Sequence, residues 1–208
     1  MTLRIDQVVT SGIFSLDGED FKVDNNVWVL GDDTEALVID AAHDAAAIGA
    51  AVGARTLLGI VLTHGHNDHI DAAGKLADAT GAPLRLHPDD TMLWQVVHPD
   101  RSFEALSDAT VLTVAGTEVQ VLHTPGHSPG GVCLYVPDLG VLFSGDTLFH
   151  GGPGATGRSH SHFPTILDSI RERLLTLPPE TRVLTGHGAE TTIGAEATAY
   201  QDWVVRGH

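Results

Sequence analysis

The segment that decides the fold reads Gly59-Ile60-Val61-Leu62-Thr63-His64-Gly65-His66-Asn67-Asp68-His69. The apolar run 57–62 is typical of a buried strand, and it leads directly into three histidines and one aspartate. In an extended chain His64 and His66 share one face, whereas Asp68 and His69 fall where a helix begins. The H-x-H-x-D-H pattern therefore predicts that one metal ion binds the first pair and a second ion binds the other pair.

Three further apolar runs end in a glycine-flanked histidine or aspartate. Residues 118–123 lead to Thr124-Pro125-Gly126-His127, residues 141–143 to Ser144-Gly145-Asp146, and residues 182–185 to Thr185-Gly186-His187. Glycine beside a ligand lets the backbone approach the site closely, and a rigid set of strands can bring distant residues to one point. The resulting set is too large for one tetrahedral zinc site and suits two borderline ions: His64, His66, Asp68, His69, His127, Asp146 and His187.

The remaining pattern predicts alternating strands and helices in one continuous domain over residues 1–208. Apolar, β-branched runs bounded by turn residues predict strands at 5–9, 26–30, 36–39, 57–62, 83–87, 111–114, 118–123, 132–136, 141–143 and 182–185. Helical spacing and glycine stops predict helices at 44–52, 69–80, 89–97, 164–175 and 192–205. Residues 98–108 and the glycine-rich stretch 150–162 are expected to be loops.

The composition excludes several kinds of partner and of covalent or metal site. The net charge of −16 repels phosphate backbones and anionic lipid, which disfavours nucleic acid and membranes as partners. Cys133 is the only cysteine, so an internal disulfide and a cysteine-built metal site are excluded; we expect it to be a small core residue. The first residues lack the apolar core of a signal peptide and no run reaches transmembrane length, so a cytoplasmic location is expected.

Together these motifs resemble the motif series of the metallo-β-lactamase superfamily, most closely its glyoxalase II-like (hydroxyacylglutathione hydrolase-like) branch, over about residues 26 to 190. The resemblance implies an α/β (α+β) class fold, a four-layer αββα sandwich of two mixed β-sheets. It also implies how the ligands divide: His64, His66 and His127 for the first ion, Asp68, His69 and His187 for the second, and Asp146 between them.

We expect other roles for the polar residues outside this set. Asp40 closes a strand and is expected to orient a ligand histidine. The resemblance gives Arg158 a supporting role at the site, although Gly157-Arg158-Ser159-His160 departs from the family's Gly-Arg-x-Asp pattern. Two histidines, His87 and His123, are expected to be structural. The other three are expected on a surface loop, with a place in the pocket left open: His150, His160 and His162.

The resemblance implies hydrolysis of an acyl thioester by two divalent ions. Nitrogen and oxygen ligands favour zinc and also accept iron or manganese. Asp68 and Asp146 are the candidate catalytic groups, and the expected partner is a small-molecule thioester. The segment after His187 carries few basic side chains to grip glutathione, and residues 23–28 and 151–158 resemble actinobacterial members associated with mycothiol. The thiol carrier and the oligomeric state, a homo-oligomer included, stay open.

Other functions occur on the same scaffold. A persulfide dioxygenase with one iron ion is the main alternative, and a lactonase is another. A lactonase typically needs a pocket tyrosine, and the chain has only Tyr135 and Tyr200, in an expected strand and the expected last helix. A true β-lactamase is disfavoured by Asp146, and a nuclease by the net charge. A non-catalytic binding protein is disfavoured because all seven ligand positions are retained.

Overall fold

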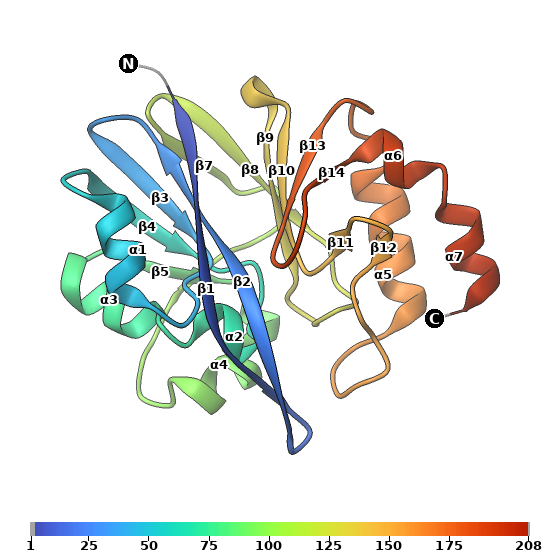
Figure 1. Ribbon diagram of the computed structural model, residues 1–208, viewed down its shortest axis with the longest axis horizontal. Coiled ribbons are helices and arrows are strands. Elements are labelled where there is room, and N and C mark those ends of the chain that lie inside the picture. Colours follow the sequence, from blue (N-terminus) through green and yellow to red (C-terminus); the bar gives the residue numbers. More distant parts are fainter. Residues whose placement is uncertain (1–2, 208) are drawn as a thin grey trace.

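The computed structural model describes residues 3–207 and contains two six-stranded sheets (Figure 1). The first sheet contains, in hydrogen-bonded order, β1 (Arg4–Leu16), β2 (Glu19–Gly31), β3 (Glu35–Ile39), β4 (Thr56–Val61), β5 (Leu84–Leu86) and β6 (Glu104–Ala105). The second contains β14 (Thr191–Thr192), β13 (Arg182–Thr185), β10 (Val141–Gly145), β9 (Val132–Val136), β8 (Thr117–His123) and β7 (Val111–Val114). A small ribbon pairs β11 (Leu148–Phe149) with β12 (Gly152–Pro153).

Both sheets are mixed. In the first, β1, β2 and β3 pair antiparallel, whereas β3, β4, β5 and β6 pair parallel. In the second, the only parallel pair among the described strands is β10 with β13. The αββα architecture expected from the sequence is therefore confirmed.

Helices cover the outer face of each sheet. In Figure 1, α1 (Ala45–Val52) and α3 (Ala73–Thr80) lie outside the first sheet, and α5 (Phe163–Ser169), α6 (Ile193–Ala197) and α7 (Tyr200–Arg206) lie outside the second. Two further short helices are α2 (Asn67–Ile70) and α4 (Thr91–Val97), the latter preceded by the 3₁₀ turn η1 (Pro88–Asp90). The turn η2 (Pro137–Leu139) joins β9 to β10, and the π-helical η3 (Ile170–Leu174) extends α5.

The alternation of side chains along a strand explains the layers. In β2, Val27 and Val29 pack under the helices of the first sheet, whereas Trp28 and Leu30 point into the core between the sheets. That central core also receives Phe143 from the second sheet. A third core lies between the second sheet and its own helices. Strands buried on both faces read as continuous apolar runs, which is why the central ones were predicted correctly.

Several elements differ from the sequence predictions. Residues 98–108 and 150–162 were predicted to be loops but contain β6 and β12, two-residue strands that are too short to give a sequence pattern. The predicted helix 164–175 becomes π-helical at Ile170. The β1–β2 hairpin is much longer than the predicted 5–9 and 26–30, because each strand has 13 residues. The predicted helix 69–80 is divided into α2 and α3, although Gly81 ends it as expected. The predicted last helix is divided into α6 and α7, and its first residue lies in β14. Between residues 3 and 207, no helix is both long and apolar enough to cross a membrane.

Candidate metal centre

The structure brings all seven predicted side chains together at one edge of the sandwich. His64 and His66 follow β4, and Asp68 and His69 lie on the short helix α2. His127, Asp146 and His187 follow β8, β10 and β13, so they come from the second sheet. Each sheet therefore contributes part of one cluster.

His64, His66 and His127 form the first group. Each offers one ring nitrogen, and these atoms all lie within 4.8 Å of one another. His66 Nδ1 and His127 Nε2 are 3.0 Å apart. The His64 and His66 residues are buried, whereas the His127 side chain is 12% exposed.

Asp68, His69 and His187 form the second group. The Nε2 atoms of His69 and His187 are 3.2 Å apart, and His187 Nε2 lies 3.3 Å from Asp68 Oδ2. Asp146 lies between the groups: its Oδ1 is 3.3 Å from His69 Nε2, and its Oδ2 is 3.6 Å from His127 Nε2. His64, His69 and Asp146 form a further group of possible ligands that links the other two.

Hydrogen bonds on the outer side fix the protonation of these rings. His69 Nδ1 donates to Asp40 Oδ2 at 2.9 Å, and His187 Nδ1 donates to the carbonyl oxygen of Asp24 at 2.7 Å. His127 Nδ1 likewise donates to the carbonyl oxygen of Ala155. In the neutral rings the Nε2 lone pairs of His69 and His187 therefore face each other, and a proton or a cation has to lie between them.

Unpartnered atoms also fit a metal site. Among the described residues, the cluster holds three buried ligand-type atoms without a hydrogen-bond partner, namely His64 Nε2, Asp68 Oδ1 and Asp146 Oδ1. His66 Nε2 is also without one, but the nitrogen of this ring that lies near His127 is Nδ1. A buried polar atom normally has a partner, because leaving one unsatisfied costs about 1–3 kcal/mol. A set of imidazole nitrogens and carboxylate oxygens with unused lone pairs fits divalent transition-metal ions.

The pKa values in the cluster also fit a metal site. Burial lowers the pKa of His64 and lowers that of His66 to about 3, so both rings are neutral, as a ligand must be. Burial opposes ionisation of Asp68, but the charge of His69 and hydrogen bonds hold its pKa at about 2. Burial likewise opposes a charge on His187, yet Asp146 and Asp68 raise its pKa to about 10. The two carboxylates thus attract positive charge that protons on histidine supply when no metal is bound.

Asp40 has the orienting role that the sequence predicted. Its carboxylate accepts from His69 Nδ1, and it also accepts from the Thr63 backbone N–H at 2.8 Å and the Thr63 hydroxyl at 3.0 Å. Because that hydroxyl donates to Asp40, it accepts from His64 Nδ1 at 3.1 Å. Asp40 therefore fixes one histidine of each group.

Strand β2 holds the loop that carries His187, a feature the sequence analysis missed. Asn26 donates from its side chain to the carbonyl oxygens of Thr185 and Gly188, each at 3.0 Å, and its backbone N–H donates to Gly186 O. Gly186 has no room for a side chain, because a Cβ there would lie 2.2 Å from Asp146 Oδ1. No sequence pattern links an asparagine in β2 to a loop some 160 residues later.

Asp90 connects the two loops of the first group and was also missed. Its carboxylate accepts from the backbone N–H groups of Gly65 at 2.7 Å and Gly130 at 2.6 Å, and from the Ser128 hydroxyl at 2.7 Å. Gly65 lies between His64 and His66, and Ser128 follows His127. The only sequence signal was an acidic residue near the start of a predicted helix.

Arg158 does not contact the seven side chains through any described hydrogen bond or ion pair. It pairs with Glu19 at 2.7 Å and lies 5.0 Å from the ring centre of Phe21, both near the tip of the β1–β2 hairpin. The hairpin also places Phe14 edge-on to His66, with ring centres 5.4 Å apart. Arg158 therefore ties a loop of the second half of the chain to the hairpin beside the cluster.

Five other histidines lie where the sequence predicted them, two packed in the structure and three on surface loops. His87 and His123 stack with ring centres 4.1 Å apart and planes 7° apart. Although Asp89 lies nearby, the in-plane lone pairs of two parallel rings cannot converge on one ion, so we do not assign a metal to this group. Three histidines are exposed: His150, His160 and His162. Cys133 is fully buried, as predicted.

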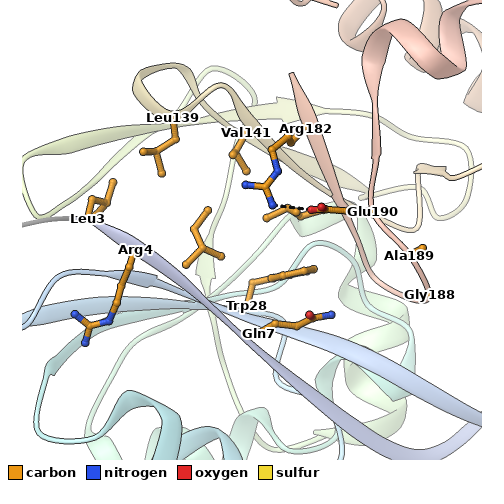
Figure 2. Close-up of a pocket in the computed structure, with 12 residues that line it drawn as sticks. Leu3, Arg4, Gln7, Trp28, Leu139, Val141, Arg182, Gly188, Ala189 and Glu190 are labelled. Atoms are coloured by element: carbon orange, nitrogen blue, oxygen red, sulfur yellow. Dashed lines mark hydrogen bonds and ion pairs between the residues drawn. The ribbon is translucent and has the colours of Figure 1, made fainter. Parts of the chain in front are cut away.

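A pocket of about 650 Å³ lies away from the cluster (Figure 2). Its apolar wall includes Trp28 and Val141, and two of its lining residues, Arg182 and Glu190, form an ion pair at 2.6 Å. Its lining contains none of the seven side chains. The candidate functional site is therefore the cluster and not this pocket, because groups that react have to contact their substrate.

Comparisons with known proteins agree with the cluster. A family profile described as "Metallo-beta-lactamase superfamily" matches residues 21–187. The chain is 34% identical to "Probable metallo-hydrolase YqgX" of Bacillus subtilis, covering 82% of this chain and 88% of that protein. It is 33% identical to "Hydroxyacylglutathione hydrolase GloC" of Haemophilus influenzae, covering 66% of this chain and 72% of that protein.

Two solved structures are similar in fold and sequence. The structure of TTHA1623 in a di-iron-bound form has a TM-score of 0.76 and 33% identity, covering 84% of this chain and 93% of that one. The structure of ETHE1 from Myxococcus xanthus has a TM-score of 0.72 and 26% identity, covering 91% of this chain and 81% of that one.

Proposed function

Because the chain belongs to the metallo-β-lactamase superfamily, we propose that it is a dinuclear metallohydrolase that cleaves an acyl thioester of a low-molecular-weight thiol. The observation that carries this proposal is the position of Asp146, whose two oxygens lie near His69 of one group and His127 of the other. The similarity to a hydroxyacylglutathione hydrolase supports the substrate class.

In this proposal one ion would be held by His64, His66 and His127 and the other by Asp68, His69 and His187, with Asp146 placed near both groups. We expect the ions to be zinc, although nitrogen and oxygen ligands also bind iron and manganese. The similarity to a protein solved with two iron ions supports iron as an alternative. When bound, two adjacent ions supply Lewis acidity that activates water and polarises a carbonyl group.

The chain's own residues would accept a proton, orient the ligand side chains and contact the acyl group. We assign to Asp68 Oδ1 the acceptance of a proton from the attacking water, since this atom is buried and has no partner within residues 3–207. Asp68 Oδ2 is held by Asn25 at 3.0 Å, which keeps the carboxylate in one orientation. Phe14 beside His66 and Phe149 beside His187 flank the cluster with apolar surface suited to an acyl group.

Thiol release from a panel of acyl thioesters tests the proposal. The panel contains lactoyl-glutathione and formyl- and acyl-mycothiol, and the zinc-loaded protein is compared with its Asp146→Ala variant. We expect turnover that falls by at least 10²-fold in the variant, because the residue between the two groups is lost. The preferred carrier identifies the thiol. No turnover with any thioester contradicts the proposal.

A persulfide dioxygenase that uses one iron ion is the second candidate, and the similarity to ETHE1 favours it. Oxygen uptake by the iron-loaded protein with a persulfide distinguishes the two activities. A lactonase has less support. Tyr135 lies in β9, and Tyr200 is buried with its hydroxyl donating to the carbonyl oxygen of Leu167, so both tyrosines belong to the core outside the cluster.

A further inference from the structure

A chain of three polar side chains outside the cluster ends on Asp68. Asp71 contacts His43, His43 contacts Asn25, and Asn25 contacts Asp68. The His43 side chain is only 5% exposed and Asn25 is fully buried. Buried polar groups of this kind normally have a specific task, because their desolvation is costly unless every hydrogen bond is made.

Both ring nitrogens of His43 face oxygen atoms. Nδ1 lies 2.9 Å from Asp71 Oδ2, and Nε2 lies 3.0 Å from Asn25 Oδ1. Asp71 also accepts from the His43 backbone N–H at 2.6 Å, so the same carboxylate holds both the ring and the backbone. A neutral imidazole has one N–H and would set its second nitrogen's lone pair against an oxygen, whereas an imidazolium donates to both.

The orientation of the Asn25 amide follows from its other neighbour. Its nitrogen lies 3.0 Å from Asp68 Oδ2. The reversed amide would place its oxygen against this carboxylate, which only accepts hydrogen bonds when ionised. The NH₂ group therefore donates to Asp68, and the amide oxygen is left to accept from His43 Nε2.

The backbone around His43 makes room for this ring. Gly12 in β1 lies directly against it: a Cβ at position 12 would lie 2.1 Å from His43 Nδ1. His43 itself has a φ of 60°, a conformation that a non-glycine residue adopts at some cost. Two local features thus accommodate one buried histidine ring.

We propose that His43 is a doubly protonated positioning residue that, through Asn25, holds Asp68 in the orientation required by the second metal ion. This inference rests on the proposed function, since it assigns Asp68 to that ion. The charged chain Asp71–His43 lets Asn25 present its NH₂ group in one direction only. Asp68 Oδ2 is then fixed while Oδ1 remains without a partner among the described residues.

The first test is the protonation of His43 itself. Nitrogen-15 NMR of the zinc-loaded protein at pH 7.5, assigned with a His43→Gln variant, reports the state of each ring nitrogen. We expect both His43 nitrogens in the protonated range. A single-proton tautomer overturns the inference, whatever the activity of the protein.

The second test measures zinc binding by equilibrium dialysis. Wild type is expected to bind two ions per chain, and His43→Gln to bind the second ion about 10- to 100-fold more weakly while the first is unchanged. His87→Gln is the matched control, because His87 is also buried and makes no described hydrogen bond to the seven side chains. Equal binding of both ions by wild type and His43→Gln overturns the inference.

The Asn25→Asp variant distinguishes whether Asn25 positions Asp68 for zinc binding or only stabilises the fold. This variant keeps an acceptor for His43 but turns a carboxylate toward Asp68, so we expect it to bind the second ion more weakly than His43→Gln does. If the contact only stabilises the fold, the added ion pair with His43 leaves zinc binding at the wild-type value, which contradicts the inference. Circular dichroism and the unfolding midpoint confirm that each variant is folded.

The outcomes also separate this inference from the proposed function. If wild type binds two zinc ions but cleaves no thioester, the thioester proposal fails and the zinc measurements still decide the role of His43. If wild type binds fewer than two ions, the dinuclear proposal and this inference both fail. If wild type cleaves thioesters and His43→Gln has the same zinc affinity and the same kcat, only this inference fails.

Discussion

At the scale of single residues, Asp90 joins the two loops that carry the first group, His64, His66 and His127. It is fully buried, and its three acceptor contacts are to Gly65, Ser128 and Gly130. We expect Asp90→Ala to lower the free energy of unfolding by about 3 kcal/mol, because it leaves several buried donors without an acceptor. Urea denaturation measures this change, and zinc dialysis should show weaker binding of the first ion.

Asp89→Ala is the matched control for Asp90→Ala. The Asp89 side chain is 58% exposed and lies on the same 3₁₀ turn. Its loss should change the free energy of unfolding by no more than about 0.5 kcal/mol. Equal destabilisation by the two variants would show that the Asp90 contacts do not hold the loops.

Cys133 gives a prediction about pH. Burial raises the pKa of this thiol from 9.0 to about 11. An unfolded chain therefore loses the thiol proton before the native protein does, so the contribution of this group to stability is present below pH 9 and is lost as the pH rises toward 11. A shift of this size corresponds to roughly 2–3 kcal/mol.

Urea denaturation at pH 8 and at pH 10.5 checks the Cys133 prediction. The difference in unfolding free energy between wild type and Cys133→Val should change between the two pH values, with wild type losing more stability at the higher pH. All other side chains are the same in the two proteins, so their effect cancels in the comparison. An unchanged difference between the two proteins contradicts a raised thiol pKa.

The residue scale also shows what a sequence can reveal about a site. The seven side chains were predictable because each lies in a short segment that follows an apolar run and contains glycine. Asp40 was predictable because it ends a strand. Asn25, Asn26, His43 and Asp90 were not assigned roles at the site because their partners lie far away in the chain, and only the packed sheets bring them together.

At the scale of elements, the outer half of the β1–β2 hairpin extends past the body of the first sheet (Figure 1). It reaches the loop 157–161 of the other half of the chain, where the Ser159 N–H donates to Asp17 Oδ2 at 3.1 Å. Its Phe14 contacts His66, and Phe21 is 39% exposed. This ribbon was underpredicted because the side chains of its outer half are at most partly buried, and its apolar residues, such as the adjacent Ile13 and Phe14, do not alternate strictly with polar ones in the sequence.

We expect Phe14→Ala to raise KM about tenfold while changing the free energy of unfolding by roughly 1 kcal/mol or less. The reason is that the ring is only partly buried and supplies apolar surface beside His66, not core packing. Steady-state kinetics with the preferred thioester measure the effect. Val9→Ala in the same strand is the control, since Val9 is 59% exposed, and its KM should equal that of wild type. An unchanged KM in Phe14→Ala means that the hairpin does not contact the substrate.

At the scale of the whole molecule, metal binding should contribute strongly to stability. Asp68 and Asp146 are buried carboxylates among neutral or proton-sharing histidines, and zinc supplies the positive charge they attract. A ligand at 1,000 times its Kd stabilises the native state by about 4 kcal/mol, which corresponds to a Tm increase of roughly 8–16 °C for a chain of this size. Differential scanning calorimetry with zinc and with a chelator measures the shift.

Asp146→Ala tests the origin of that shift. Without the residue between the two groups, zinc should raise Tm by less than half as much as in wild type. An equal rise in both proteins would place the bound zinc outside the seven-residue cluster.

The overall layout was predictable because the central strands are apolar on both faces and helices end at glycines such as Gly53 and Gly81. The breaks within two predicted helices were not predictable. Asp71, at the first break, uses its side chain to hold His43, and the local sequence alone does not show this contact.

Each sheet comes from one continuous half of the chain, since β1 to β6 end at Ala105 and the strands of the second sheet begin at Val111. Four of the seven ligand-type side chains belong to the first half and three to the second. Neither half carries a complete ion-binding group, because His127 and His187 are in the second half and their partners are in the first. Coordination would therefore add a removable cross-link to the apolar core that already packs the two sheets together. After a protease cut at residues 106–110, we expect the two fragments to separate at a lower urea concentration with a chelator than with zinc.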